Sequence, residues 1–280
     1  MNTSLRTMLE DDTATRVMGI LNATPDSFYD GGRYYTPEEA AAHAARMAAD
    51  GAHILDIGAE SSRPGATPVS LEEELRRALP AVEAAVPTGL PVSIDTWRAE
   101  TARRALALGA VMVNDITGLR GDPAMVEVVA ASGCFCVIMH MRGTPRTMQD
   151  DPTYTDVIAD ISAFFEERVT YALDNGISED RIWLDPGFGF GKTVEQNLAL
   201  LRHLDAFHAL GFPLLIGTSN KSTIGAVLDV PPEDRSGGTA ATVAIAIVKG
   251  VHCVRVHDVK TMARVARMSD AVVRAAPRSD

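Results

Sequence analysis

The chain has 280 residues, of which 46% are hydrophobic and 5% aromatic, and its formal net charge is −11. This length and apolar content suit one barrel-sized domain or two small ones. The acidic balance argues against a nucleic-acid surface, which needs a basic stripe, but it allows a small anionic ligand where cations gather locally. No apolar run reaches the roughly 18 residues of a membrane span, so we expect no membrane partner.

The cysteines indicate a reducing compartment. Their count is odd, and Cys134, Cys136 and Cys253 do not have the spacing of a disulfide framework. Cys134 and Cys136 also lack the second pair that a zinc site would need, so we expect ordinary buried thiols. Residues 10–12 are acidic and no apolar signal core precedes them. We therefore expect a cytoplasmic protein.

Eight short apolar runs along the chain are typical of buried strands, and the segments between them have the 3.6-residue period of helices. One helix is expected over 37–50, with Pro37 in its first turn, and another over 71–86. A third, over 156–175, is followed by Gly176 as a capping residue. The predicted strands cover 16–21, 53–57, 91–94, 111–113, 135–139, 181–184, 213–216 and 253–256.

Strands that alternate with helices form right-handed parallel units. Eight such units predict an α/β fold of the (β/α)8 or TIM barrel type, with its active site at the C-terminal ends of the strands. A doubly wound open sheet is the alternative. No linker rich in Pro, Gly or Ser divides the chain, so we expect a single-domain barrel over 16–276, an N-terminal extension over 1–15 and a tail over 277–280.

A polar or ionisable residue lies at or just past the end of every predicted strand. Any one of them could be an ordinary strand-end cap. A barrel needs none of them for packing, however, and burying a charge without a partner is costly, so the set predicts one ligand site. These residues are Asn22, Asp56, Asp95, Asn114, His140, Asp185, the segment 219–222, and Arg255 with His257.

The chemistry of this set divides into acceptors and cations. Asp95, Asn114 and Asp185 carry carboxylate and amide groups that suit a flat, nitrogen-rich ring with several N–H donors. The residues that are cationic, or can become so, suit a phosphate group. They are Arg63, Lys221, Arg255 and His257. Ser222 opens a predicted helix, where an anion such as a carboxylate would be favoured.

The segment 184–193 reads LDPGFGFGKT, and its glycines allow backbone to approach a ligand closely or to adopt positive φ. It is not a P-loop, because Pro186 stands where that motif needs glycine. It is not a dinucleotide fingerprint either, because Lys192 stands where the third glycine is required. The loops 23–35 and 59–69 are long, and we expect them to act as mobile lids.

Seven segments resemble those of the dihydropteroate synthases of folate biosynthesis, and together they span 17–259. They read MGILNATPDSF, DIGAESSRPGA, SIDTW, VNDITG, DPGFGFGKT, SNKS with GTAA, and RVHDV. The resemblance implies condensation of 6-hydroxymethyl-7,8-dihydropterin diphosphate with 4-aminobenzoate, giving 7,8-dihydropteroate and diphosphate with Mg²⁺. It also implies a homodimer that associates through the last helices.

The resemblance also implies a role for each matching position. Catalysis would rest on Asp95, Asp185, Lys221 and Arg255. The pterin would be held by Asp56, Asp95, Asn114, Asp185 and Lys221, and the diphosphate by Arg63, Arg255 and His257. The aminobenzoate site would be formed by Phe28, Ser62, Pro64, Phe190 and Ser222, and Asn22 would help to bind Mg²⁺. No side-chain nucleophile is needed, because the aromatic amine attacks the pterin methylene after a cationic pterin has formed.

Two positions depart from the pattern of the family. Ser62 stands where threonine is usual and keeps the hydroxyl group. Asn220 stands where arginine is usual and removes a charge beside Lys221. Two other functions remain open: a pterin-binding methyltransferase domain, and an inactive paralogue of the synthase. Arg63, with the Arg255 and His257 pair, favours the synthase, because a methyltransferase needs no grip on a diphosphate.

Overall fold

The computed structural model describes residues 14–23, 36–62, 65–150 and 152–274. Its strands are all parallel and follow the order β6-β5-β4-β3-β2-β1-β8-β7. A further parallel bridge between Leu184 and Leu214 brings the β6 edge against the β7 edge and closes the sheet. The strands are β1 Arg16–Asn22, β2 Ile54–Gly58, β3 Val92–Asp95, β4 Met112–Asp115, β5 Phe135–Met139, β6 Ile182–Asp185, β7 Leu215–Ile216 and β8 Cys253–Val256.

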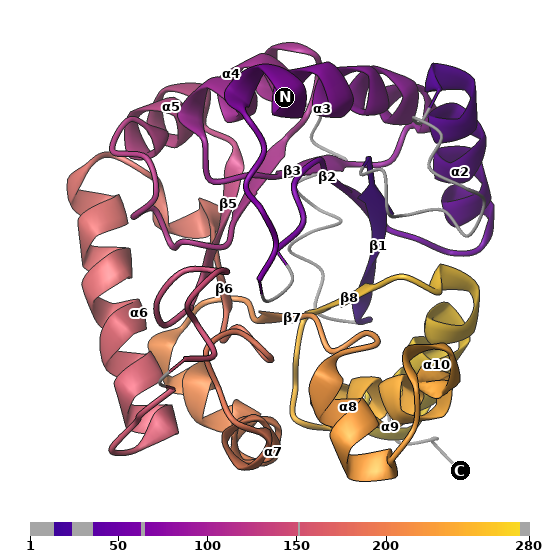
Figure 1. The fold of residues 1–280 in the computed structure, drawn as a ribbon, viewed down its shortest axis with the longest axis vertical. Coiled ribbons are helices and arrows are strands. Elements are labelled where there is room, and N and C mark those ends of the chain that lie inside the picture. The colour runs from indigo at the N-terminus through magenta and orange to yellow at the C-terminus, as the bar shows by residue number, and fades with distance from the viewer. Residues whose placement is uncertain (1–13, 24–35, 63–64, 151, 275–280) are drawn as a thin grey trace, which may run out of the picture.

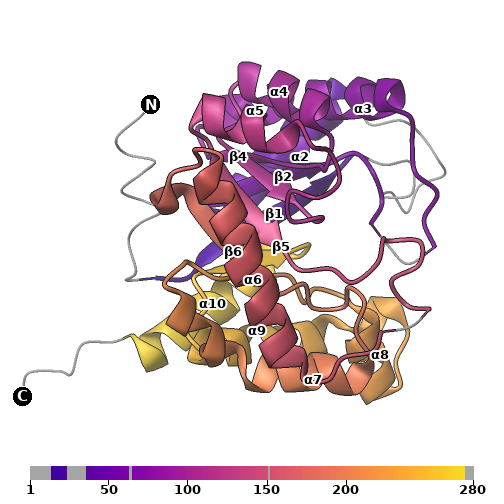
Figure 2. The same ribbon diagram turned by 90° about the vertical axis from the view of Figure 1, so that its left-hand side faces the viewer.

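Helices surround this sheet, as the view in Figure 1 and the side view in Figure 2 both show. The (β/α)8 barrel predicted from the sequence is therefore confirmed. The described helices are α2 Pro37–Ala49, α3 Leu71–Ala85, α4 Ala99–Ala107, α5 Met125–Ser132, α6 Val157–Asp174, α7 Val194–Arg202, α8 Ser222–Leu228, α9 Ser236–Val248 and α10 Val259–Val273. None of the helices in the described ranges is both long and apolar enough to cross a bilayer.

Local sequence signals determine where the helices begin and end. Pro37 occupies the first turn of α2, where its missing N–H costs nothing, and Thr36 caps that helix by accepting from the backbone N–H of Glu39. α6 ends before Gly176, which adopts a left-handed φ of 88°, as the C-cap prediction requires. α3 ends at Ala85, one residue earlier than predicted, because the chain tightens there into a short 3₁₀ helix.

The last predicted strand before β8 is shorter than expected. The sequence predicts 213–216, but β7 covers only Leu215–Ile216. The two preceding residues still join the barrel, because the Pro213 carbonyl accepts from the N–H of Leu184 at 2.9 Å and Leu214 forms the closing bridge. The apolar run 213–216 is therefore part of the barrel wall, as predicted, although only half of it pairs continuously with β8.

Apolar side chains fill the inside of the barrel, so the barrel is a packed core and not a pore. Each of these residues is at most 2% exposed. They are Met18, Ile54, Met112, Phe135, Val137, Trp183, Leu215 and Cys253. The three cysteines are free and buried, as expected. Because the interior is filled, a ligand has to bind at one end of the strands.

Candidate functional site

The strands bring most of the predicted ligand residues to one end of the barrel. Asp95 and Asp185 are the last residues of β3 and β6, and Asn114 lies in β4 directly beside Asp95. Asp56 lies in the middle of β2 rather than past its end, and Arg255 lies within β8. Side chains from strands far apart in the sequence therefore face each other, as the strand-end pattern predicts.

Arg255 is the centre of the site. Its Nε donates to Asp56 Oδ2 at 2.6 Å, and its Nη2 donates to Asp95 Oδ2 at 2.7 Å. The Arg255 side chain is only 19% exposed. Burial alone would lower the pKa of this guanidinium, but the carboxylates of Asp56 and Asp95 raise it above its ordinary value. The guanidinium is thus a permanent cation that ties β8 to β2 and β3.

Two buried acceptor atoms beside this ion pair lack a hydrogen-bond partner among the described residues. Asn114 Nδ2 donates to Asp56 Oδ2 at 3.1 Å, which leaves Asn114 Oδ1 and Asp56 Oδ1 buried and unsatisfied. Leaving a buried acceptor unsatisfied costs about 1–3 kcal/mol, so such atoms indicate a bound partner. A ligand that presents N–H groups to these two oxygens would relieve the cost.

Burial also governs the acidity of the two strand-end aspartates. It raises the pKa of Asp95 to about 7, against the lowering effect of Arg255 and with a further increase from Asp56. Burial raises the pKa of Asp185 as well, although the N–H of Gly187, which donates to its Oδ1 at 2.7 Å, lowers it. These carboxylates would gain from N–H donors or from positive charge on a ligand.

Lys221 approaches the same end of the barrel from the segment after β7. Its Nζ donates to the carbonyl of Phe188 at 2.5 Å and lies 4.1 Å from the ring centroid of Phe190. Burial lowers the pKa of Lys221 to about 7, and Asp185 opposes this shift. A cation thus lies near the buried carboxylates, against an aromatic ring.

Ser219 orients His257, at the outer edge of the site. The Ser219 Oγ accepts from the backbone N–H of His257 at 3.2 Å and lies 2.9 Å from His257 Nδ1. Ser219 is only 7% exposed, whereas His257 is exposed. The hydroxyl therefore fixes the orientation of the imidazole ring and leaves Nε2 on the side of the ring opposite Ser219. The sequence marked this serine as a strand-end polar residue without indicating its partner.

Asn22 ends β1 close to Asp95. A Cβ added to Gly58 would lie 3.5 Å from Asn22 Oδ1 and 3.6 Å from Asp95 Oδ2, so both oxygens border the same glycine. No group of three His, Cys, Asp or Glu residues that could hold a metal ion occurs in the described parts of the chain. A metal at Asn22 would therefore need oxygen ligands from another source.

Other predicted residues lie elsewhere or are not described. Phe28, Arg63 and Pro64 fall outside the described residues, as do residues 24–35 of the lid expected over 23–35 and both chain ends. Ser62 is half-buried at the end of the described part of its loop, and Ser222 is exposed at the start of α8. His140 is buried behind the glycine segment, where burial and Lys192 lower its pKa to about 2, so it stays neutral.

The departure at Asn220 has a backbone reason. Asn220 adopts a φ of 56°, in the left-handed region that asparagine tolerates better than most residues. Its side chain is exposed, as expected for a residue at the rim. Its carbonyl accepts from Arg235 Nη1 at 3.0 Å, and its N–H donates to Thr239 Oγ1 at 3.1 Å. The neighbouring segment thus holds the turn without a charge at this position.

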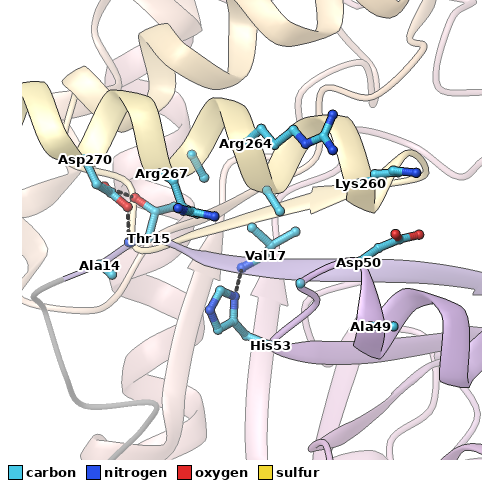
Figure 3. Close-up of a pocket in the computed structure, with 13 residues that line it drawn as sticks. Ala14, Thr15, Val17, Ala49, Asp50, His53, Lys260, Arg264, Arg267 and Asp270 are labelled. Atoms are coloured by element: carbon cyan, nitrogen blue, oxygen red, sulfur yellow. Dashed lines mark hydrogen bonds between the residues drawn. The ribbon is translucent and has the colours of Figure 1, made fainter.

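A cavity of about 350 Å³ lies at the other end of the barrel, between the start of β1, the end of α2 and α10 (Figure 3). Its lining includes Thr15, His53 and the exposed cations of α10, but none of the predicted site residues. The N-terminal face of this barrel type contributes to stability more than to catalysis, so this cavity is not the candidate active site.

Comparison with known proteins agrees with the site geometry. Residues 18–257 match the family described as "Pterin binding enzyme". The dihydropteroate synthase of Synechocystis is 48% identical over 96% of this chain and 94% of its own length. The Yersinia pestis dihydropteroate synthase, solved as a sulfonamide drug complex, has a TM-score of 0.91 and 42% identity, with 95% of this chain and 96% of that chain covered.

The dihydropteroate synthase of Thermus thermophilus, solved in complex with 4-aminobenzoate, is similarly close. It has a TM-score of 0.84 and 45% identity, and the match covers 94% of this chain and 96% of that chain. These similarities extend over nearly the whole barrel and include every strand that contributes to the site. The chain therefore belongs to the dihydropteroate synthases, enzymes of the pterin-binding family.

Proposed function

We propose that the site joins 6-hydroxymethyl-7,8-dihydropterin diphosphate to 4-aminobenzoate and releases diphosphate. The observation that carries this proposal is the set of buried acceptors around Arg255, above all Asp56 Oδ1 and Asn114 Oδ1, which lack a partner among the described residues. A pterin presents N–H donors on one edge and matches this arrangement. The complex of the T. thermophilus relative with 4-aminobenzoate supports the second substrate.

In this proposal Asp95, Asn114 and Asp185 accept from the pterin ring, Asp56 supports them, and Lys221 supplies a donor beside Asp185. Arg255 has a double role. It holds the ring-binding carboxylates in place, and its remaining N–H groups would face the diphosphate together with Arg63 and His257. Arg255, which the sequence groups with the phosphate cations, is thus hydrogen-bonded to Asp56 and to the ring acceptor Asp95.

Mg²⁺ fits this site through Asn22. An amide oxygen is a ligand type that Mg²⁺ accepts, and this ion usually takes few protein ligands and completes its shell with water and substrate phosphates. Asn22 Oδ1 borders Gly58 beside Asp95, close to where the diphosphate would lie. When bound, the ion would help to neutralise the charge of the leaving diphosphate.

We assign the aminobenzoate site to Phe28, Ser62, Pro64, Phe190 and Ser222. The bond between the pterin methylene carbon and the diphosphate oxygen breaks, and the amine nitrogen then bonds to that carbon and loses a proton. No protein nucleophile takes part. Asp185 and Asp95 stabilise the electron-poor pterin, and Arg255 stabilises the departing diphosphate, because preorganised charges act strongly where water is excluded.

Release of diphosphate distinguishes this function from the alternatives. The purified protein is mixed with the pterin diphosphate and 4-aminobenzoate, and diphosphate is measured with each substrate omitted in turn. We expect release only when both substrates and Mg²⁺ are present. Pterin binding without diphosphate release would support a methyltransferase-type pterin domain or an inactive paralogue, and no binding of either substrate would refute the proposal.

Replacing Asp95 with asparagine should weaken pterin binding more than aminobenzoate binding. Asparagine keeps the shape but removes the charge that pairs with Arg255 and accepts from the ring. A hydrogen bond to a charged group contributes roughly 1.5–3 kcal/mol, so pterin affinity should fall by about ten- to a hundredfold. Calorimetric titration with the pterin measures the effect, and Asp50→Asn, at the opposite end of the barrel, is the control. Wild-type affinity in Asp95→Asn would contradict the role.

Replacing Asn220 with arginine should change the reaction little. The residue is exposed, and charges at exposed positions contribute under about 1 kcal/mol, so the KM for 4-aminobenzoate should change by less than about tenfold. Arginine must also adopt a left-handed φ, which adds a modest cost in stability. Steady-state kinetics of both proteins measure this. An inactive wild type beside an active Asn220→Arg variant would favour the paralogue.

We propose that the enzyme is a cytoplasmic homodimer that associates through its last helices. Large apolar side chains are exposed there: 54% for Val227 of α8, 62% for Val248 of α9 and 66% for Met268 of α10. The three buried, free cysteines suit a reducing compartment. Sedimentation of the purified protein measures the oligomeric state, and a monomer at micromolar concentration would contradict the dimer. The domain bounds 1–15, 16–276 and 277–280 stay predictions.

A further inference from the structure

The segment 187–191 follows β6 and carries Phe190 over Lys221. Its three glycines all have positive φ: 68° at Gly187, 82° at Gly189 and 61° at Gly191. Because every second residue of this segment has a positive φ, its backbone cannot form a regular ladder of hydrogen bonds. Most of its carbonyls therefore need donors other than neighbouring backbone N–H groups. Side chains supply them instead, and each of the five consecutive carbonyls accepts from one.

The donors are four side chains, two of which belong to the segment between β5 and α6. Lys221 Nζ reaches Phe188 O at 2.5 Å, Gln149 Nε2 reaches Gly189 O at 3.2 Å, and the Tyr154 hydroxyl reaches Gly191 O at 2.8 Å. Lys192 Nζ serves the remaining two carbonyls, at 2.9 Å from Gly187 O and 3.0 Å from Phe190 O. Lys192 is thus the donor that spans the loop from its first residue to its fourth.

The Lys192 side chain is buried and held by several contacts. It is only 2% exposed, and its third contact is His140 Nδ1 at 3.0 Å. Burial lowers the pKa of Lys192 to about 7, partly offset by Asp185. As an ammonium, Lys192 donates to both carbonyls and to the neutral imidazole. As an amine it still has two N–H groups for the carbonyls and can accept from the imidazole, so the loop contacts survive in either state.

The loop has no room to shift toward the chain behind it. A Cβ on Gly187 would lie 1.9 Å from the carbonyl oxygen of His140, and a Cβ on Gly191 would lie 2.7 Å from that of Arg142. The backbone therefore lies directly against the segment after β5. Without the Lys192 contacts, the loop can relax only toward the ligand site, and the Phe190 ring would move with it.

We propose that Lys192 is a positioning residue that sets the affinity for 4-aminobenzoate by holding Phe190 in place beside Lys221. This rests on the proposed function, in which Phe190 forms part of the aminobenzoate site. Of the groups assigned to the bond-breaking step, Asp95 and Arg255 belong to β3 and β8 and make none of the loop contacts above. Asp185, at the end of β6, accepts from the backbone N–H of Gly187, a contact that does not involve Lys192. Loss of Lys192 should therefore act on binding of the amine more than on turnover.

The test is Lys192→Met, which keeps the length of the side chain and removes its donors. Loss of a buried hydrogen-bond donor corresponds to about a tenfold change in an equilibrium constant, so the KM for 4-aminobenzoate should rise by about tenfold or more. The kcat at saturating substrate should fall by less than about threefold, because the groups assigned to the bond-breaking step keep their own contacts. Lys192→Arg should restore part of the affinity. Lys260→Met, an exposed lysine of α10, is the matched control.

Tyr154→Phe is a second test, which removes only the hydrogen bond from the Tyr154 hydroxyl to the carbonyl of Gly191. It should raise the same KM by a smaller factor, and it keeps the inference testable if Lys192→Met does not fold. Two results for a folded Lys192→Met variant would overturn the positioning role: an unchanged KM for 4-aminobenzoate, or a fall in kcat with that KM unchanged. In either case, diphosphate release by the wild type would leave the proposed function intact. A wild type that releases no diphosphate would instead refute the function.

Discussion

Replacing Arg255 with alanine is expected to reduce kcat/KM by at least about a thousandfold. The guanidinium bonds Asp56 and Asp95 at once, so its loss leaves two buried carboxylates facing each other. Removing one partner of a buried ion pair costs about 3–5 kcal/mol of stability, and removing a charge that stabilises a leaving group typically costs a further hundred- to thousandfold in kcat. The loss of stability and the loss of turnover therefore both follow from this single substitution.

Three measurements separate these effects. Steady-state diphosphate release gives kcat and KM, urea unfolding gives the free energy of unfolding, and calorimetry with a pterin lacking the diphosphate gives ring affinity. Because Arg255 holds the carboxylates that we propose bind the pterin ring, we expect that ring affinity to fall too. Arg264→Ala, an exposed arginine of α10, is the control. A folded Arg255→Ala variant with turnover within about tenfold of wild type would contradict the central role of this residue.

The pH dependence of stability gives an independent check on Arg255→Ala. Burial raises the folded-state pKa of Asp95 to about 7, and Arg255 lowers it, so the variant should have a still higher value. A raised carboxyl pKa means that the folded state binds more protons than the unfolded state, so stability increases as pH falls through that pKa. The stability deficit of the variant relative to wild type should therefore shrink between about pH 8 and pH 6.

Removal of Mg²⁺ should have the second largest effect. Chelator-treated enzyme is expected to lose activity by at least about a hundredfold, since the leaving diphosphate would then lack the neutralising charge that we assign to Mg²⁺. Added Mg²⁺ should restore turnover. Calorimetry with diphosphate alone, with and without Mg²⁺, gives a readout independent of turnover, and Asn22→Ala should raise the Mg²⁺ concentration needed for half-maximal rate. Full activity after chelation would refute both the ion and the Asn22 assignment.

The strands were the most predictable part of the fold. Parallel strands inside a barrel are buried on both faces, so each appears as a continuous apolar run whose length matches the wall. The remaining errors are small and lie at strand ends, as in the run before Leu215, where apolar residues join the wall through a bridge rather than a ladder. Helix ends with a local signal, such as Pro37 or Gly176, were also predicted correctly.

The sequence also indicated which residue types gather at the ligand end, because parallel strands deliver their last residues to one place. It did not indicate their pairing. Arg255 was expected to serve the phosphate, yet it bonds Asp56 and Asp95. The sequence distinguishes Lys192 only as the residue that breaks a dinucleotide fingerprint, although its side chain donates to two carbonyls of the segment 187–191. Neither contact has a local signature in the residues around it.

The sequence by itself determined the eight-stranded barrel and the family, and it predicted the end of the barrel at which ligands bind, since these depend on periodic patterns and on short motifs. Only the tertiary structure decided which acceptors stay unsatisfied, which cation pairs with which carboxylate, and why Asn220 suits its turn. These features depend on distances between residues as far apart as Asp56 and Arg255, and on backbone angles such as the φ of 56° at Asn220. Such distances arise only when the barrel closes and brings β8 beside β1.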